Sequence, residues 1–152
     1  METRIREAAL SPELLETLIA LSADWEAEGS CHGYRKNTAA DIEGNRIFLL
    51  ERETDGAVLG YLFGHAERAK NSSSVMPDGT PYFEIEEIYV VPERRSQGIG
   101  RRLFAFAEET ARREELPFLM LSTATKNARA ILHFYLDELD MTFWNSRLFK
   151  KL

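Results

Sequence analysis

The sequence has few of the features that mark secreted or membrane-spanning proteins. It contains one cysteine, Cys31, so no disulfide can form within the chain. Proteins that live in the reducing cytoplasm usually lack disulfides. No apolar run approaches the ~20 residues that a membrane-spanning helix needs, and no apolar segment follows the first residues as it would in a secretory signal. We therefore expect a cytoplasmic protein with no membrane partner.

An excess of basic residues is also missing. The chain has 19 lysines and arginines against 25 aspartates and glutamates, a formal net charge of −6. Binding to nucleic acid depends on lysines and arginines that neutralise phosphates. The composition therefore predicts no nucleic-acid partner, and an acidic surface is compatible with a cationic ligand.

Two common phosphate-binding motifs are absent. A P-loop requires a Gly-Lys pair followed by Ser or Thr, and no Gly-Lys pair occurs in the chain. The dinucleotide motif G-x-G-x-x-G begins at Gly98 and Gly100, but Leu103 stands at its third glycine position. Nucleoside triphosphatases of the P-loop kind and dinucleotide-dependent oxidoreductases are thereby excluded.

The remaining composition is that of a globular protein. Hydrophobic residues make up 44% and charged residues 29% of 152 positions, which fits about one domain on the usual ~150-residue scale. We expect a single domain over residues 1–152. Periodicity and turn residues predict strands over 3–9, 46–53, 57–67, 82–91 and 118–122, helices over 11–29, 38–42, 99–115 and 127–139, and a strand or short hairpin over 141–152.

This order of elements predicts an α/β (α+β) fold. Strands and helices are interspersed, so we expect a mixed, mostly antiparallel central sheet with helices on both faces.

The segment Val90 to Leu103 has the pattern of an anion-binding site. A strand ends there, a loop with two glycines follows, and a helix begins. The first turn of a helix presents unpaired N–H groups and a positive dipole end, and glycines let a ligand approach the backbone closely. Phosphate oxygens fit such a site.

The same segment resembles the acyl-CoA signature of the GNAT superfamily of N-acetyltransferases, [QR]-x-x-G-x-[GA]. Arg95-Ser96-Gln97-Gly98-Ile99-Gly100 matches it, and the preceding Ile88 to Glu93 is also similar to that family. The resemblance covers nearly the whole order of elements. It implies the GNAT fold, acetyl-CoA as co-substrate, no metal, and a set of cofactor-binding residues: Ile88, Tyr89, Val90, Arg95, Ser96, Gln97, Gly98, Ile99, Gly100, Arg101 and Asn127.

Acetylation of an amine also needs a general base, and three glutamates near one strand end are candidates. Strand alternation places Glu84 and Glu86 on one face and Ile85 on the other. The apolar pattern then breaks at Glu86-Glu87, which predicts a β-bulge, a feature that often redirects side chains near active sites. The segment resembles that of polyamine acetyltransferases in which a glutamate is the base. We rank Glu86 first, Glu84 second and Glu87 third.

A general acid is the second requirement, and the resemblance implies Tyr135. Its spacing from Asn127 is one residue longer than in the family pattern, which turns a helical position by ~100°. Asp140 stands where the family usually has glycine. His133 is an alternative group for the site, although a surface position fits this histidine better. The resemblance also implies that Trp25, His32, Tyr34 and Arg35, near the first helix, shape the acceptor site, although Trp25 fits a core position better.

These observations predict direct transfer of an acetyl group from acetyl-CoA to a primary amine of a small cationic molecule, within a ternary complex. The alternatives are acetylation of a protein N-terminus or lysine, and a non-catalytic acyl-CoA-binding regulatory module. The C-terminal run Phe143 to Phe149 makes a homodimer a further expectation.

Overall fold

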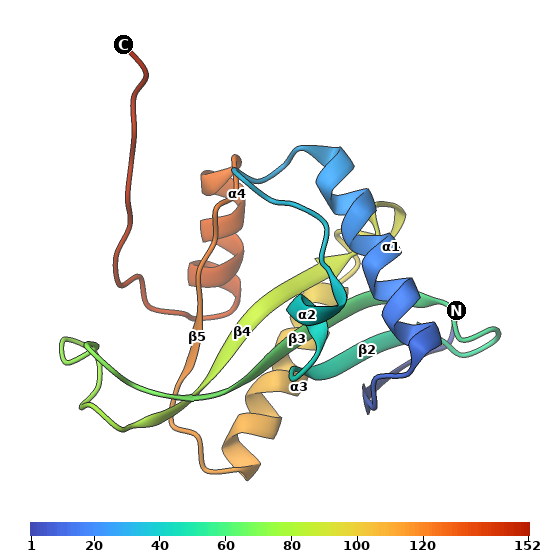
Figure 1. The fold of residues 1–152 in the computed structure, drawn as a ribbon, viewed down its shortest axis with the longest axis horizontal. Helices are drawn as coiled ribbons and strands as arrows, with labels where there is room; N and C mark the ends of the chain where they lie inside the picture. The colour runs from blue at the N-terminus through green and yellow to red at the C-terminus, as the bar shows by residue number, and fades with distance from the viewer.

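Five strands form one sheet in which spatial order follows sequence order (Figure 1). The computed structural model describes residues 1–152. Neighbouring strands are antiparallel except the last pair, β4 and β5, which is parallel. The predicted mixed, mostly antiparallel sheet is confirmed. The strands are β1 (Thr3–Ala8), β2 (Arg46–Arg52), β3 (Val58–Arg68), β4 (Pro81–Val90) and β5 (Leu119–Leu121).

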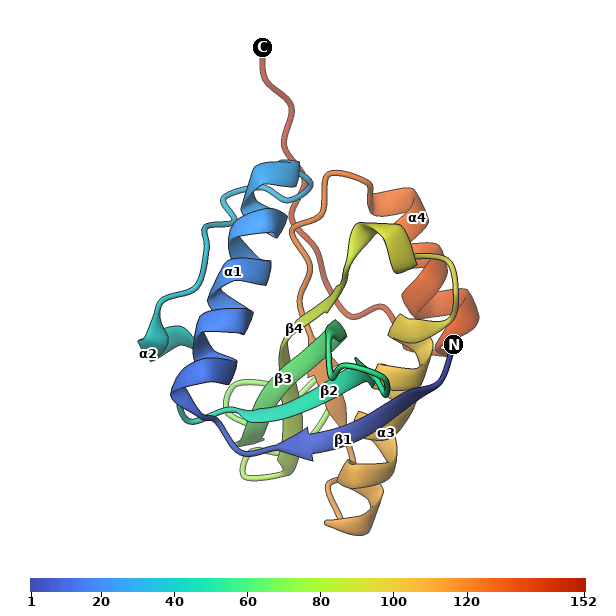
Figure 2. The same cartoon turned by 90° about the vertical axis from the view of Figure 1, so that its right-hand side faces the viewer.

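Helices cover both faces of this sheet, as predicted (Figure 2). One face carries α1 (Pro12–Glu28) and the short α2 (Ala39–Ile42), and the other carries α3 (Ile99–Arg113) and α4 (Ala128–Leu132). A single 3₁₀ turn, Pro92–Arg94, follows β4, and a π-helical segment, His133–Glu138, continues α4. None of these helices is both long enough and apolar enough to span a bilayer.

The ends of α1 follow directly from its sequence. The Ser11 hydroxyl accepts a hydrogen bond from the Leu14 backbone N–H at 3.1 Å, and Pro12 occupies the first helical position. Both features stabilise a helix start. Gly29 ends the helix with φ 62°, a left-handed conformation that glycine adopts without strain.

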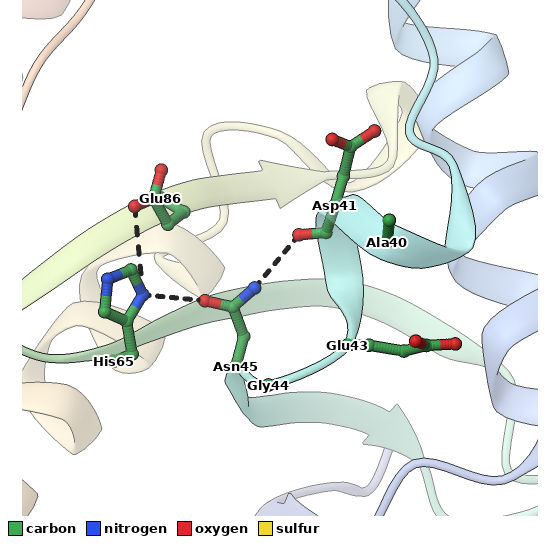
Figure 3. Close-up of a pocket in the computed structure, with 7 residues that line it drawn as sticks. All are labelled: Ala40, Asp41, Glu43, Gly44, Asn45, His65 and Glu86. Carbon is green, nitrogen blue, oxygen red and sulfur yellow. Dashed lines mark hydrogen bonds and ion pairs between the residues drawn. The ribbon is translucent and has the colours of Figure 1, made fainter.

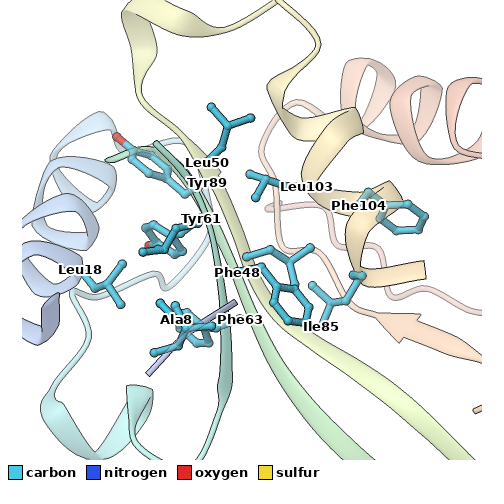
Figure 4. Packing of buried hydrophobic residues seen from close by; sticks show 14 of the residues in the cluster. Ala8, Leu18, Phe48, Leu50, Tyr61, Phe63, Ile85, Tyr89, Leu103 and Phe104 are labelled. Atoms are coloured by element: carbon cyan, nitrogen blue, oxygen red, sulfur yellow. The ribbon is translucent and has the colours of Figure 1, made fainter. Parts of the chain in front are cut away.

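The core lies on both sides of the sheet (Figure 4). On the α1 side, Leu18 packs toward Tyr61 and Phe63, whose rings stack 5.7 Å apart. On the α3 side, Leu103 and Phe104 pack toward strand residues of the sheet. Each fully buried large apolar side chain contributes ~1.5–3 kcal/mol, so these two layers fix the sheet on which the site is built.

A β-bulge interrupts the pairing of β3 with β4. Phe63 pairs with Glu87 and Gly64 pairs with Ile85, so Glu86 is the extra residue. The predicted bulge is confirmed. A Cβ on Gly64 would lie 2.1 Å from the Glu84 carbonyl oxygen. Glycine is therefore required at this position for the two backbones to approach as they do.

The C-terminal segment differs from its prediction. Residues 141–152 form neither a strand nor a hairpin, and residues 142–152 take part in no backbone hydrogen bond. The segment runs away from the sheet as an extended chain (Figure 1). Its side chains stay largely in solvent, since Leu148 and Phe149 are 94% and 80% exposed and the Phe149 ring only meets the edge of His32, 5.5 Å away.

Candidate active site

A cleft opens where β4 and β5 separate. The two strands pair only from Phe83–Leu119 to Ile85–Leu121, and the rest of β4 has no partner on that side. A cavity of about 950 Å³ occupies the gap. Its walls include residues 85–90 of β4, residues 121–125 from the end of β5 onward, and the start of α3. The unpaired edge of β4 can therefore bind an extended ligand through backbone hydrogen bonds, as an added strand would.

The loop before α3 forms one end of this cleft. Ser96 and Gly98 both have positive φ, 60° and 80°, and Gly98 is the N-cap of α3. The first helical hydrogen bond runs from the Arg102 N–H to the Gly98 carbonyl at 3.0 Å. The N–H groups of residues 99–101 consequently have no acceptor within the helix. The loop thus presents backbone donors at the positive end of a 15-residue helix, where phosphate binds well.

Arg95 uses its side chain to hold this loop in place. Its guanidinium donates to Glu28 Oε2 at 2.9 Å and to the Val90 carbonyl at 3.0 Å. It also lies over the Tyr89 ring, 5.4 Å from the centroid. Hydrogen bonding from Arg95 lowers the pKa of Glu28. Arg95 therefore links the loop to α1, and its side chain is already engaged by protein groups.

Glu86 lies where the large cleft meets a second cavity of about 430 Å³ (Figure 3). Its Oε1 is 3.8 Å from His65 Nδ1, and that nitrogen is 3.0 Å from Asn45 Oδ1. Asp41 and Glu43 also line the small cavity, but their carboxylates point away from it (Figure 3). Glu86 is thus the carboxylate that faces both spaces.

Glu84 has an unusual pKa and a different position. Burial raises the pKa of Glu84 to about 7, and the negative charge of Glu86 adds to the rise. Glu84 pairs with His65 across the sheet. It lines neither the large cleft nor the small cavity. A general base must first be within reach of its proton, so the geometry favours Glu86 over Glu84.

Glu87 is partly buried in the wall of the large cleft. The Tyr61 hydroxyl donates to Glu87 Oε2 at 2.9 Å, and the Tyr34 hydroxyl lies 3.1 Å from Oε1 and 3.2 Å from Oε2. Burial raises the pKa of Glu87, and the polar groups of Asn37, Tyr61 and Tyr34 oppose the rise. Both carboxylate oxygens already have protein donors, which distinguishes Glu87 from Glu86.

Tyr135 lines the cleft despite the extra residue between it and Asn127. The helix changes from α to π at His133. Because π-helical hydrogen bonds span five residues rather than four, such a segment accommodates one additional residue. Burial raises the pKa of Tyr135 to about 12, so the hydroxyl keeps its proton at neutral pH. His133 is exposed and pairs with Asp137 at 2.7 Å, so it does not face the site.

The cleft brings together most of the predicted residues. Gln97 is the one predicted cofactor-binding residue outside the lining, and its amide is 3.4 Å from the Glu93 carbonyl. Trp25 both packs against the core and lines the cleft. Lining residues that were not predicted include Phe134, which closes on Gly100, and Cys31, whose backbone bridges to Thr125. Phe134 had a signal, because it directly precedes the predicted acid on the same helix.

No group of three or more histidine, cysteine, aspartate or glutamate side chains is arranged to hold a metal ion. The cleft offers a strand edge, a loop of backbone donors, and side chains that include the Glu86 carboxylate and the Tyr135 phenol. The residues therefore fit a long, extended ligand with phosphates at one end.

Comparison with curated proteins gives a relative from Lactobacillus delbrueckii subsp. lactis, described as an uncharacterised N-acetyltransferase in the pepI 3' region. It is 37% identical over 83 residues, which cover 55% of this chain and 46% of the relative. The matched part thus spans about half the length of that relative.

Solved structures with the same fold cover almost the whole chain. An aminoglycoside N-acetyltransferase in complex with CoA has a TM-score of 0.66 and 18% identity, with 98% of each chain covered. A glucosamine-6-phosphate N-acetyltransferase from Arabidopsis thaliana has a TM-score of 0.67 and 14% identity, with 99% of each chain covered. At these identities the likeness establishes the fold.

The family assignment rests on a direct match of sequence. The model of the acetyltransferase (GNAT) family matches residues 13–139, from the start of α1 to the residue after the π-helical segment. This range contains the bulge, the glycine loop and Tyr135. The chain therefore belongs to the GNAT family of acetyltransferases.

Proposed function

We propose that residues 1–152 act as one domain that transfers an acetyl group from acetyl-CoA to a primary amine of a small cationic molecule. The observation that carries this proposal is the position of Glu86. Its carboxylate borders both the cleft between β4 and β5 and the smaller cavity beside His65. One base can therefore contact an amine in the small cavity while the acyl donor occupies the cleft.

The chain would hold acetyl-CoA with two sets of backbone groups. N–H groups between Ser96 and Arg101 face the position that suits a pyrophosphate, at the start of α3. The free edge of Ile88 to Val90 suits the extended pantetheine arm. Asn127, at the start of α4, lines the same cleft. Acetyl-CoA supplies the acetyl group as a thioester, which an amine can attack.

Charge near the small cavity favours a cationic acceptor. Beyond the effect of burial, the charges of Glu86 and Glu67 raise the pKa of Glu84, so three carboxylates lie close enough to repel one another. An ammonium group entering this region would relieve that repulsion. The aminoglycoside and glucosamine-6-phosphate acetyltransferases that share the fold are named for small amine-bearing substrates, which is compatible with this acceptor class.

Glu86 would remove the proton that prevents attack. An alkyl ammonium such as that of lysine ordinarily has a pKa of ~10.4, so it is mostly protonated at neutral pH and cannot act as a nucleophile. Side-chain exposure of 45% lets Glu86 pass the proton on to solvent after each turnover. The amine would then attack the thioester directly in a ternary complex, with no acyl-enzyme step.

The other two roles fall to the bulge and to Tyr135. Backbone N–H groups freed at the bulge would donate to the thioester oxygen as negative charge develops there. Tyr135 keeps its proton because burial raises its pKa to about 12. It would donate this proton to the departing thiolate.

We also propose a homodimer formed through the C-terminal segment. Residues 142–152 expose Phe143, Leu148 and Phe149 and have no backbone partners. The outer edge of β5 has no neighbouring strand. A second copy offers both an edge and an apolar surface to the segment. Light scattering would give a dimer mass for the intact chain and a monomer mass for a Leu148→Ser, Phe149→Ser variant.

The test of the proposed function is release of free thiol from acetyl-CoA in the presence of different amines. The panel holds polyamines, aminoglycosides, aminosugar phosphates, lysine peptides and peptides with free N-termini. Release that depends on a small cationic amine supports the proposal. Release only with peptides would show a protein acetyltransferase. Tight acetyl-CoA binding without release for any amine would favour the binding module.

A further inference from the structure

The segment between α1 and α2 forms the acceptor-side wall of the cleft. His32, Gly33 and Tyr34 line the cavity, and the segment continues into α2, whose Asp41 lines the small pocket. One end of the segment is fixed by the His32 N–H, which donates to the Ala124 carbonyl at 2.8 Å. The position of this segment therefore affects both cavities.

Between His32 and Lys36, only the Tyr34 hydroxyl makes hydrogen bonds. Its partner is Glu87, at 3.1 Å and 3.2 Å from the two carboxylate oxygens. The next hydrogen bond along the segment is made by the Lys36 N–H, which donates to Oε2 of Glu26 in α1 at 2.8 Å. Glu87 is thus the one point at which the middle of the segment is held to the sheet.

The contact between Tyr34 and Glu87 is fixed on both sides by further packing and hydrogen bonds. Tyr61, from the central strand β3, is fully buried and donates to Glu87 Oε2 at 2.9 Å. The Tyr34 ring stacks on Trp25 of α1, with centroids 4.3 Å apart. Trp25 stacks in turn on Tyr89, 5.4 Å away. These contacts fix both the Tyr34 ring and the Glu87 carboxylate, and so define one position of the wall.

Glu87 directly follows Glu86, the extra residue of the bulge. Its side chain is fixed by two donors that come from different parts of the fold. The Glu87 carboxylate that binds the wall therefore also fixes β4 next to the bulge, where Glu86 has no partner on β3.

We propose that Glu87 is a positioning residue that ties the acceptor-side wall, through Tyr34, to the strand carrying Glu86, and so sets the affinity for the amine. This inference rests on the proposed function. It assigns Glu87 a role in substrate positioning that differs from proton transfer, because its oxygens are occupied by tyrosine donors. The chain offers a matched pair for testing it, since Tyr34 and Tyr61 donate to the same carboxylate, one from the wall and one from the sheet.

The experiment compares Tyr34→Phe, Tyr61→Phe and Glu87→Gln with the unchanged protein. Loss of one hydrogen bond in such a site is worth ~1.4 kcal/mol, or ~10-fold. We expect KM for the amine to rise ~10-fold in Tyr34→Phe and Glu87→Gln, with the Kd for acetyl-CoA unchanged. Tyr61→Phe should lower stability and leave KM for the amine within ~2-fold.

Two kinetic outcomes would overturn the inference. Equal KM changes in Tyr34→Phe and Tyr61→Phe would mean that the contacts serve stability alone. A fall in kcat for Glu87→Gln as large as that for Glu86→Gln, at unchanged KM, would make Glu87 the base.

A second measurement needs no amine and separates this inference from the proposed function. Amide hydrogen exchange over residues 31–37, with acetyl-CoA bound, should speed up in Tyr34→Phe and Glu87→Gln but not in Tyr61→Phe. Equal exchange rates in all three variants would contradict the proposed link between the wall and the strand, even if no amine is ever turned over. Failure of turnover in the unchanged protein, with the expected exchange pattern, would reject only the proposed acceptor chemistry.

Discussion

Glu86 and Glu87 are neighbours in sequence, and both side chains lie on the face of the sheet that α1 and α2 cover. The bulge causes this, because Glu86 has no partner on β3 while Glu87 pairs with Phe63. Glu86 reaches the small cavity beside His65, whereas Glu87 lines only the large cleft and is held there by Tyr34 and Tyr61. Two adjacent carboxylates thereby receive different environments from one backbone irregularity.

The bulge depends on Gly64, which leads to a first prediction. Gly64→Ala would place a Cβ 2.1 Å from the Glu84 carbonyl oxygen, so the two strands must move apart. We expect a loss of ~1–3 kcal/mol in the free energy of unfolding, as for other overpacked sites. Because Glu86 would also shift, kcat should fall ~10-fold or more. Urea unfolding and thiol-release kinetics measure the two effects. A variant with unchanged stability and unchanged kcat would show that catalysis does not depend on the bulge.

Tyr135→Phe tests the proposed acid. Removing the hydroxyl should lower kcat by ~10²-fold, the lower end of what general acids contribute, and leave the Kd for acetyl-CoA unchanged. Since the pKa of Tyr135 is raised to about 12, the unchanged enzyme should show no alkaline fall in kcat below pH ~10 from this group. A variant with normal kcat across this pH range would remove Tyr135 from the mechanism.

Gly98→Ala tests the cofactor loop. Gly98 has φ 80° at the N-cap of α3, and alanine in this region costs ~1–2 kcal/mol of backbone strain. The loop would relax and its N–H groups would turn, so we expect the Kd for acetyl-CoA to rise ~10-fold.

The control for that experiment is Gly79→Ala. Gly79 has φ 87° and, like Gly98, has no atoms within 4 Å of a Cβ position. It lies in the loop between β3 and β4 and does not line the cleft. Its replacement should cost a similar amount of stability without changing the Kd, as calorimetry would show. Equal Kd changes in the two variants would contradict a specific role for Gly98.

Glu84→Gln should make the protein more stable above neutral pH. The folded-state pKa of Glu84 is about 7 against an ordinary value of 4.5, so the folded protein binds the extra proton between these values. Stability contributed by this group is therefore lost as pH rises from 4.5 toward 7.

At pH ~8 the variant should gain ~1–2 kcal/mol over the unchanged protein, a figure reduced for solvent screening of a half-exposed group. Below pH ~4.5 the two proteins should unfold alike. Denaturant unfolding at both pH values measures this difference. A variant that is less stable at high pH would show that the Glu84 charge is favourably paired.

Much of the fold could be predicted because its signals are local. Ser11-Pro12 and Gly29 bound α1, and the break in alternation at Glu86-Glu87 predicted the bulge. The glycine loop before α3 was recognisable from Gly98 and its neighbours. Gly64 carried a missed signal, since glycine inside a strand often marks a bulge on the partner.

Other features depend on contacts between distant residues. Tyr34 meets Glu87 across 53 positions, and no periodicity reports such a pair. The π-helical segment accommodates the extra residue between Asn127 and Tyr135 and so brings Tyr135 into the cleft. In a regular α-helix the extra residue would have turned Tyr135 by ~100°. The expected C-terminal strand was wrong, because residues 142–152 form no backbone hydrogen bonds with the rest of the chain although the outer edge of β5 is free. The cytoplasmic location and the lack of a nucleic-acid partner stay predictions from composition.

The role of Glu86 as the base is decided by Glu86→Gln, assayed for thiol release with the best amine of the panel. The substitution keeps the size of the side chain and removes its ability to take a proton. We predict a fall in kcat of ~10²-fold or more, with the Kd for acetyl-CoA unchanged and a fall several-fold smaller in Glu84→Gln. A Glu86→Gln enzyme with normal kcat would contradict the assignment of the base and, with it, the proposed use of the two cavities.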